Sequence, residues 1–202
     1  MVTISSVLPL VATHAPHVGD PVIEAAILRA ATRFCERTGI WRGVIEIDSI
    51  YKATSEIEYF LERGRKLVSL VKVHVGREEM RLAGDEILFP EARGGRPHSV
   101  ALIDDKLVFD TPLSLGDRVS AYGTFAPSTD ADSLPDLFSG EWHDALVSGS
   151  LAELFRYAPP SSQDYQLSAL HEARFESAIT QATARARSGR THAARSVKYG
   201  GL

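Results

Sequence analysis

The sequence predicts an α+β fold: a three-helix core with an antiparallel, sandwich-like or barrel-like β lobe inserted between the first and second helices. Apolar residues recur every three or four positions near the N-terminus and again over the last third of the chain, as in amphipathic helices. From residue 40 to 127 the spacing changes to two, with β-branched and aromatic residues between Gly, Asp and Pro. Strands and helices do not alternate, so a doubly wound nucleotide-binding fold is not expected.

The first helix is expected at about residues 21–38. Asp20 is the expected N-cap, and Pro21 suits the first helical position because its missing N–H costs no helical hydrogen bond there. Gly39 is expected to end the helix as a left-handed C-cap. The residues at helical spacing are Ile23, Ala26, Ile27, Ala30 and Phe34.

The middle of the chain reads as a series of short strands. In one expected hairpin the strands are joined by Asp104-Asp105, a pair that suits a two-residue turn. Several short strands at this spacing indicate a small antiparallel sandwich or barrel. The expected strands are Trp41–Ile50, Glu56–Leu61, Leu67–Val75, Glu79–Leu82, Glu86–Phe89, Ser99–Ile103, Lys106–Phe109 and Arg118–Phe125.

Two further helices are expected after the strands. One spans about 135–157 behind the candidate cap Ser133, with Gly149 as a tolerated weak point. Pro159-Pro160 should end it, and Asp164 or Ser162 should cap the next, at about 164–187. The expected organisation is therefore a helical core domain (1–39 and 128–188), an inserted β subdomain (40–127) and a C-terminal arm (189–202).

Composition places the chain among globular proteins. Of 202 residues, 44% are apolar and 24% charged, which is ordinary globular usage. Cys35 is the single cysteine, so no intrachain disulfide is expected. The chain has neither a run of about 20 apolar residues nor a signal-peptide pattern at its start, so we expect a soluble, intracellular product.

Charge is distributed unevenly along the chain. The net charge is -4, yet residues 177–202 contain five Lys and Arg and no acid. A basic tail on an acidic body is typical of docking on an acidic partner, either nucleic acid or protein. A solvated, disordered terminus is the alternative interpretation.

The sequence carries no recognised catalytic or phosphate-binding motif. His14 and His17 form an H-x-x-H in a loop, which is weak support for a metal site. Asp130, Asp132, Asp136 and Glu141 faintly resemble a calcium loop, but Pro135 stands where that loop needs glycine, and helix-capping roles explain these acids better. Buried packing is the expected role of Cys35, Trp41 and Trp142. No metal or cofactor is expected.

Three parts of the sequence resemble head-to-tail adaptor proteins of tailed bacteriophages, of the tail tubular protein A type. The first is residues 34–41, Phe-Cys-Glu-Arg-Thr-Gly-Ile-Trp, after the Asp-Pro helix start. The second is residues 127–136, followed by Trp142 and by Gly-Ser-Leu at 149–151. The third is the proline break before a long helix with an Ala/Arg-rich end. The motif residues are Phe34, Cys35, Thr38, Trp41, Pro135, Trp142 and Gly149.

Two departures from the family pattern concern local packing. Ser150 stands where these adaptors usually carry Ala, and Asp164-Tyr165 replaces a tryptophan that commonly follows the proline break.

The resemblance implies a structural virion protein that is not an enzyme. Such adaptors form a ring, usually of twelve copies, under the portal, and this ring joins the DNA-filled capsid to the tail and continues the DNA channel. The implied partners are neighbouring copies, the portal protein, a tail nozzle or tail tube protein and tail fibres, with DNA only as channel cargo and no membrane. The implied location is the head–tail interface of the virion, after assembly in the host cytoplasm.

By the same resemblance the C-terminal arm would reach the portal. Its cations would steer the approach and its apolar residues would anchor it. The implied portal-binding residues are Arg190, Arg195, Val197, Lys198, Tyr199 and Leu202.

Two other function classes remain open from the sequence. A nucleic-acid-binding protein could use the Arg-rich tail, although Tyr199 is its single aromatic residue and the body is acidic. An enzyme has no positive support. Steep loss of binding with salt would favour nucleic acid, because phosphate contacts release counterions.

Overall fold

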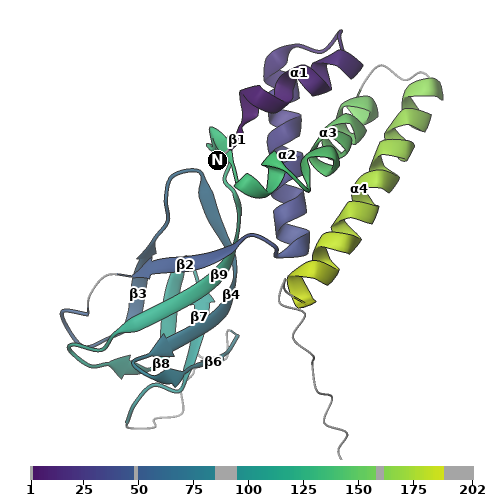
Figure 1. Cartoon of the computed structure of the whole chain (residues 1–202). Helices are drawn as coiled ribbons and strands as arrows, with labels where there is room; N and C mark the ends of the chain where they lie inside the picture. The colour runs from purple at the N-terminus through teal and green to yellow at the C-terminus, as the bar shows by residue number, and fades with distance from the viewer. Residues whose placement is uncertain (1, 48–49, 85–94, 158–161, 189–202) are drawn as a thin grey trace, which may run out of the picture.

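The computed structural model describes residues 2–47, 50–84, 95–157 and 162–188. The chain forms a helical lobe and a β lobe that lie side by side, with a single passage from the first to the second and a single return (Figure 1). This confirms the expected α+β class and the order of helix, strands and helices. The division into a helical core domain (1–39 and 128–188), an inserted β subdomain (40–127) and a C-terminal arm (189–202) stays a prediction.

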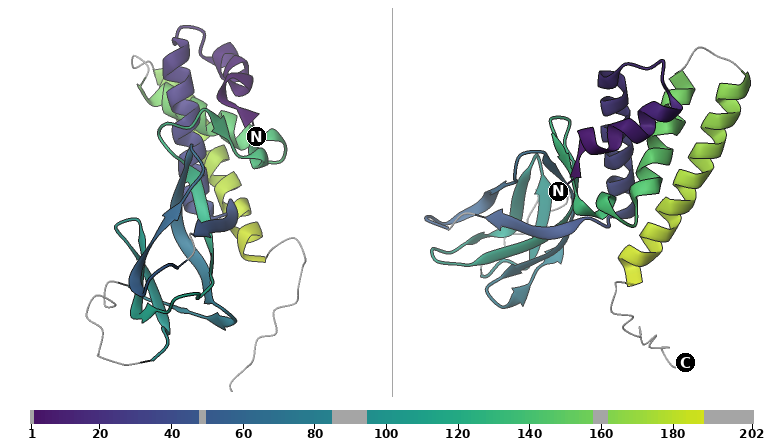
Figure 2. Two further views of the ribbon diagram at one scale, coloured as in Figure 1. Left: turned by 90° about the vertical axis from the view of Figure 1, so that its left-hand side faces the viewer. Right: turned by 45° about the horizontal axis from the view of Figure 1, so that its top comes forward.

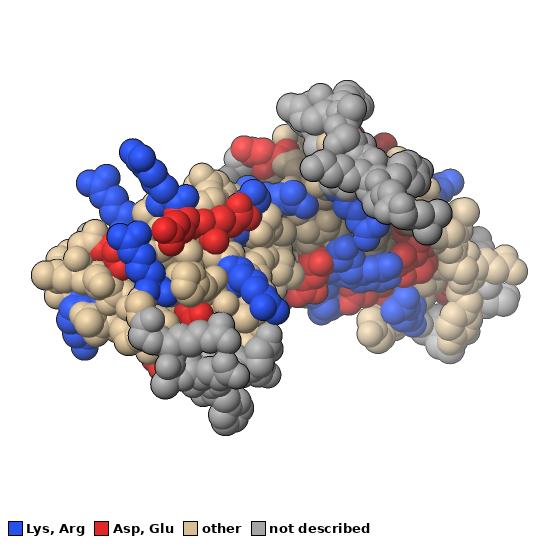
Figure 3. Space-filling view, turned by 90° about the horizontal axis from the view of Figure 1, so that it is seen from below, with Lys and Arg blue, Asp and Glu red and all other residues tan. Residues whose placement is uncertain are grey.

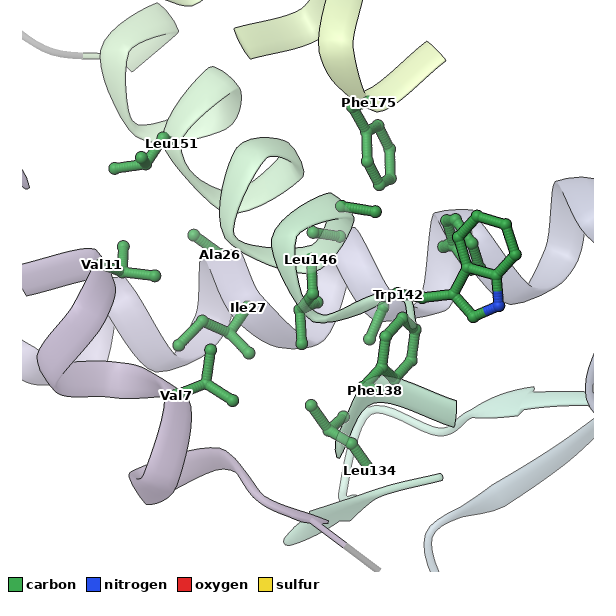
Figure 4. Close-up of a cluster of buried hydrophobic side chains, with 14 of the residues drawn as sticks. Val7, Val11, Ala26, Ile27, Leu134, Phe138, Trp142, Leu146, Leu151 and Phe175 are labelled. Atoms are coloured by element: carbon green, nitrogen blue, oxygen red, sulfur yellow. The ribbon is translucent and has the colours of Figure 1, made fainter. Parts of the chain in front are cut away.

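The helical lobe contains one helix that the sequence did not predict. It has four α-helices, α1 (Ile4–His14), α2 (Asp20–Thr38), α3 (His143–Tyr157) and α4 (Ser162–Ser188), among the described residues. The core is therefore not the expected three-helix one, because α1, which contains Pro9, lies against α2 and α3 (Figure 2). Val7 and Val11 of α1 are buried in the same core (Figure 4). The interior proline of α1 and its nearly unbroken apolar run hide the helical period. No described helix is long and apolar enough to cross a membrane.

Helix α2 begins one residue before the expected position and ends at the expected residue, Thr38. Gly19, not Asp20, is the N-cap, and Asp20 is the first helical residue. Gly39 ends the helix in the left-handed region, with φ 57° and ψ 26°, and its N–H donates to the Cys35 carbonyl. The predicted C-cap is therefore confirmed.

The helix expected at 135–157 is divided in two. A 3₁₀ turn, η2 (Asp136–Ser139), precedes Gly140, and α3 begins only at His143. Trp142 lies just before α3, where its carbonyl accepts from the Leu146 N–H at 3.0 Å. Ser133 is not a helix cap, because it belongs to the two-residue strand β10 (Ser133–Leu134), which pairs with β1 (Val2–Thr3). The helix expected at 164–187 is confirmed as α4.

The β lobe is one eight-stranded sheet with the order β5-β4-β9-β2-β3-β8-β7-β6. It curls without forming a closed barrel. The expected strand 79–82 is split into two short strands, and the strand expected to end at Phe109 continues to Leu113. The strand expected at Glu86–Phe89 lies outside the described residues. The strands are β2 (Arg42–Ile47), β3 (Thr54–Phe60), β4 (Arg65–Val75), β5 (Glu78–Glu79), β6 (Arg81–Leu82), β7 (Ser99–Ile103), β8 (Lys106–Leu113) and β9 (Val119–Pro127).

The predicted hairpin between β7 and β8 is confirmed. Asp104 and Asp105 both have positive φ, 47° and 58°, as a type I′ turn requires. The inner face of the curled sheet holds its own hydrophobic core. Its buried members are Ile45, Ile50, Ile57, Val73, Met80, Val100, Leu107, Phe109, Leu113, Ala121 and Phe125.

An aromatic cluster is the centre of the helical lobe. The Phe34 ring on α2 lies 5.5 Å from Phe138, 5.4 Å from Trp142 and 6.0 Å from Phe175, measured between ring centroids. Figure 4 shows Phe138, Trp142 and Phe175 converging from three segments, with Leu146 beside them. The expected meeting of the first helix with the segment through Trp142 in one core is therefore confirmed.

Gly149 is a close-packing position rather than a tolerated weak point. A Cβ built on it would lie 2.7, 2.8 and 3.0 Å from three ring atoms of Phe175, a residue with no exposed surface. The absence of a side chain lets α3 and α4 approach closely. Ser150, one residue on, is fully buried, and its hydroxyl donates to the Leu146 carbonyl at 2.8 Å, so the serine is satisfied where family members usually carry alanine.

Charged side chains connect α2 to α4 outside this core. Arg33 pairs with Glu172 and with Glu176, and Arg37 also pairs with Glu176. The guanidinium of Arg33 lies over the Phe175 ring, 5.1 Å from its centroid. The hydrogen bond from Arg37 is the largest cause that lowers the pKa of Glu176. The pairs are partly exposed, so they contribute less than the aromatic packing.

Removing a ring of the aromatic cluster should destabilise the protein strongly. Phe34→Ala and Trp142→Ala should each lower the free energy of unfolding by about 3–5 kcal/mol, because both rings are buried. Urea denaturation followed by circular dichroism measures the loss. Tyr51→Ala, which removes a ring that is 81% exposed, is the control and should change the free energy by less than about 0.5 kcal/mol. A loss below about 1 kcal/mol for Phe34→Ala would contradict a central role for the ring.

Gly149→Ala should destabilise the protein even though alanine is the better helix former. In open space the change would stabilise α3 by about 0.8–1.0 kcal/mol, but here the added methyl meets Phe175 and overpacking should cost about 1–3 kcal/mol. Ser148→Ala in the same helix is the control. Adding Phe175→Leu should relieve part of the cost, so the two changes should be non-additive. Stabilisation by Gly149→Ala alone would show that α3 and α4 do not pack this closely.

Candidate docking groove at the junction of the two lobes

A groove of about 720 Å³ lies where the two lobes meet. Its walls come from the start of β2, the loop between β3 and β4, the segment around η2 and the last turn of α4. The chain crosses between the lobes at this place, so one groove combines residues from both. The lining residues are Ile40, Trp41, Arg42, Arg63, Gly64, Arg65, Ser133, Leu134, Pro135, Asp136, Leu137, Ser139, Gly140, Glu141, Trp142, Arg185 and Ala186.

Trp41 is partly buried and packs against both hydrophobic cores. Its ring lies 5.9 Å from Phe125 in an edge-to-face arrangement, and the guanidinium of Arg65 lies 5.1 Å from its centroid. The Trp41 carbonyl accepts from the Phe125 N–H at 2.8 Å. Aromatic packing and a cation–π contact therefore fix this ring from two sides.

The turn out of α2 sets the direction of Trp41. The hydroxyl of the buried Thr38 donates to the Phe34 carbonyl at 2.7 Å and accepts from the Ile40 N–H at 3.3 Å. Gly39 then takes the left-handed conformation that turns the chain into β2. The sequence motif Thr-Gly-Ile-Trp thus specifies the way the chain enters the β lobe.

The opposite wall is built by the segment before α3. Pro135 is the N-cap of η2, with φ -61° and ψ 150°, and it directs Leu134 and Phe138 into the helical core. The loop between β3 and β4 is tied to residue 128, whose N–H donates to the Gly64 carbonyl at 3.1 Å. Gly64 has φ 84°, so a side chain there would be strained, and a Cβ built on it would lie 3.4 Å from Ala131.

Arginine dominates the charged residues of the groove. Arg42, Arg63, Arg65 and Arg185 line it together with Asp136 and Glu141. Arg185 pairs with Glu141, and Arg65 pairs with Glu62 at 2.7 Å. Arg63 has only a 3.8 Å contact with Asp130, and both side chains are largely exposed. No described carboxylate pairs with Arg42, whose Nε–H donates to the Gly39 carbonyl at 3.0 Å.

The predicted motif residues fall into two groups. Trp41, Pro135 and Trp142 meet at the groove. Phe34, Cys35, Thr38 and Gly149 are buried behind it in the helical lobe. Burial raises the pKa of the Cys35 thiol well above its usual range, with a smaller contribution from Glu36, so the thiol stays protonated. The predicted arm residues lie outside the described part of the chain.

Sequence reasoning missed Arg42, Arg63 and Arg65, and it assigned Arg185 to the basic tail rather than to a groove. The four arginines come from three distant parts of the chain, and each alone reads as an ordinary surface residue. The Arg63-Gly64-Arg65 turn between two expected strands was the one local signal, but it does not show that Arg42 and Arg185 lie at the same groove.

The residues weighed as metal ligands do not come together. His14 is in the last turn of α1. Asp130 accepts a hydrogen bond from Ser128, Asp136 is in the first turn of η2, and Glu141 pairs with Arg185. Among the described residues, no group of three or more His, Cys, Asp or Glu side chains could hold a metal ion.

Comparison with known proteins identifies a family. No curated protein matches the sequence. The family model described as SU10 adaptor protein matches residues 3–197, which cover both lobes and the groove. The match supports the expected bacteriophage adaptor, although it does not single out the tail tubular protein A type. The chain belongs to the SU10 adaptor protein family.

Proposed function

We propose that this protein is a head-to-tail adaptor. Twelve copies form a ring under the portal that joins the DNA-filled capsid to the tail and continues the DNA channel. The helical lobes surround the channel, and the β lobes face outward or toward the tail nozzle or tail tube protein and the tail fibres. DNA passes through as cargo, and the role needs no catalysis, metal or cofactor.

The family match carries this proposal. It begins in β1 and ends within the C-terminal arm, so it includes the whole two-lobed body rather than one common subdomain. A body with two different lobes also suits a connector, because it presents a helical surface and a sheet surface to different partners. Membership in a structural adaptor family accounts for both features.

The C-terminal arm is the proposed portal contact. Arg185 and Arg187 lie in the last turn of α4, and residues 189–202 add Arg190, Arg195 and Lys198 without any acid. Val197, Tyr199 and Leu202 supply apolar anchors. Fixing each residue opposes binding by about 1–2 kcal/mol of entropy, so the arm needs extensive contacts on its partner.

A nucleic-acid-binding role is the weaker candidate. The underside of the molecule shows Lys and Arg interspersed with Asp and Glu rather than a basic stripe (Figure 3). Such a stripe is the usual electrostatic footprint of a nucleic-acid-binding surface. The salt dependence of portal docking should accordingly be shallow compared with that of a protein making many phosphate contacts.

Removing the arm should abolish portal docking without unfolding the body. Deletion of residues 189–202 should leave the far-UV circular dichroism and the unfolding temperature unchanged, because the truncation begins after α4. The truncated protein should no longer co-sediment with portal particles. Docking with near-normal affinity would show that the arm is not the portal anchor.

A charge-matched pair of variants separates specific contacts from net charge. Arg190→Gln, Arg195→Gln and Lys198→Gln together remove three positive charges from the arm. Lys52→Gln, Arg77→Gln and Arg118→Gln remove three exposed positive charges from the β lobe. The arm variant should dock at least tenfold more weakly, and the β-lobe variant should dock normally; equal losses would contradict a localised anchor.

A further inference from the structure

We propose that the end of the β lobe remote from the helical lobe is a docking tip for the tail-side partner of the adaptor, and that this partner presents an apolar pocket rimmed by carboxylates. The inference rests on the proposed function and names the surface with which the β lobe contacts the tail. The tip consists of Tyr51, Lys52, Arg77, Leu115 and Arg118, which come from three connections between strands.

Two large apolar side chains lie next to each other at the tip. The Gly116 N–H donates to the Ile50 carbonyl at 3.5 Å, which joins the connection before β3 to the connection before β9. Tyr51 follows Ile50 in the chain and Leu115 precedes Gly116, so both side chains belong to one surface. They are 81% and 74% exposed. Single apolar side chains on a surface are ordinary, whereas adjoining ones indicate a contact with another molecule.

The turn that carries Leu115 is fixed before any partner binds. The Ser114 N–H donates to the Asp117 carboxylate at 2.8 Å, and the Asp117 N–H donates to the Ser114 carbonyl at 3.1 Å. Gly116 has φ 85°, a backbone conformation that favours glycine. Because the turn is already formed, binding through it costs little conformational entropy.

The cations of the tip are not neutralised within the described chain. Lys52, Arg77 and Arg118 are exposed, and no carboxylate in the part of the chain that the structure describes forms an ion pair with them. The Gly76 N–H donates to the Arg118 carbonyl at 2.7 Å, which holds the turn containing Arg77 beside the connection before β9. Both acids of the adjoining strand β5 pair with other cations. The tip therefore presents unpaired positive charge around its apolar side chains.

This combination of side chains defines the chemistry of the partner. Tyrosine and arginine are the residue types that most often carry binding energy at protein interfaces, usually as anchors in pockets of the partner. Unpaired cations steer association toward a surface of the opposite charge. The complementary surface has an apolar pocket for Tyr51 and Leu115, with Asp or Glu side chains around it.

The position of the tip favours a partner on the tail side. β4 runs from Arg65 at the lobe junction to Val75 at the tip, a length of about 33 Å from the rise per residue (Figure 1). α4 ends at the junction, where Arg185 lines the groove, so the proposed portal arm leaves the molecule far from the tip. Neighbouring copies in a ring meet along their sides, whereas the tip is the end of a lobe. A protein beyond the ring is therefore the partner that fits.

Removing the two apolar anchors should weaken binding to the tail without affecting the portal. The probe is the purified tail nozzle or tail tube protein of the same virus. In biolayer interferometry, the full chain with Tyr51→Ala and Leu115→Ala should bind it at least tenfold more weakly than the wild type and should dock on the portal normally. Tyr157→Ala with Leu170→Ala removes the same side-chain types from exposed positions of the helical lobe, so this matched control should stay within twofold.

A charge variant tests the tip without removing its apolar side chains. Lys52→Gln, Arg77→Gln and Arg118→Gln together should weaken binding of the tail protein at least fivefold in low salt, while portal docking stays normal. This variant also decides the outcome if the alanine pair lowers the unfolding temperature.

Photo-crosslinking in assembled virions identifies the partner directly. Tyr51→p-benzoylphenylalanine should cross-link to the tail protein on irradiation. A cross-link to the portal or to a second copy of this chain, or no cross-link at all, would overturn the inference. Binding of the wild type to single-stranded DNA or to phosphatidylglycerol vesicles that is lost in the alanine pair, with tail binding unchanged, would also overturn it and assign the tip to nucleic acid or lipid.

Portal docking separates failure of this contact from failure of the proposed function. A chain that docks on the portal but does not bind the tail protein, or binds it equally well in all variants, refutes the tip contact and leaves the adaptor role intact. A wild-type chain that binds neither the portal nor the tail protein contradicts the adaptor role itself.

Discussion

The Phe34 ring joins the parts of the chain on either side of the β insertion. Phe34 precedes the insertion, whereas its aromatic partners Phe138, Trp142 and Phe175 all follow it. Burying the four rings together brings the two ends of the insertion to one place, which positions the β lobe. Gly149 permits this packing, because any side chain there would push Phe175 out of the cluster. The helical lobe is therefore held together by contacts between residues that precede the β insertion and residues that follow it.

Further contacts of α2 with the β lobe determine where the two lobes meet. The Thr32 hydroxyl on α2 donates to the Pro127 carbonyl at the end of β9 at 3.1 Å, and Lys66 on β4 pairs with Glu36 on α2 at 2.6 Å. Trp41 packs in both cores. These contacts give the groove a defined shape, and neither lobe alone would form it. This arrangement suits a protein whose proposed role is to connect other proteins.

The elements that the sequence predicts correctly are those specified by residues close together in the chain. The periodicity of α2 and α4, the Gly39 cap and the Asp104-Asp105 turn are local properties, and each is confirmed. The predictions are wrong where tertiary packing determines whether a helix forms or where it begins. Pro9 conceals α1, whose stability depends on burial against α2, and Gly140 divides a segment that has a continuous apolar stripe. The groove could be predicted only in part: Trp41, Pro135 and Trp142 were singled out, but four arginines meet there through the fold and share no sequence spacing.

Electron cryo-microscopy of the neck of intact virions tests the central claim most directly. The account predicts a closed ring of this chain between portal and tail, with the arms on the portal. Absence of the chain from the neck, or its presence without a ring around the DNA channel, would contradict the adaptor role.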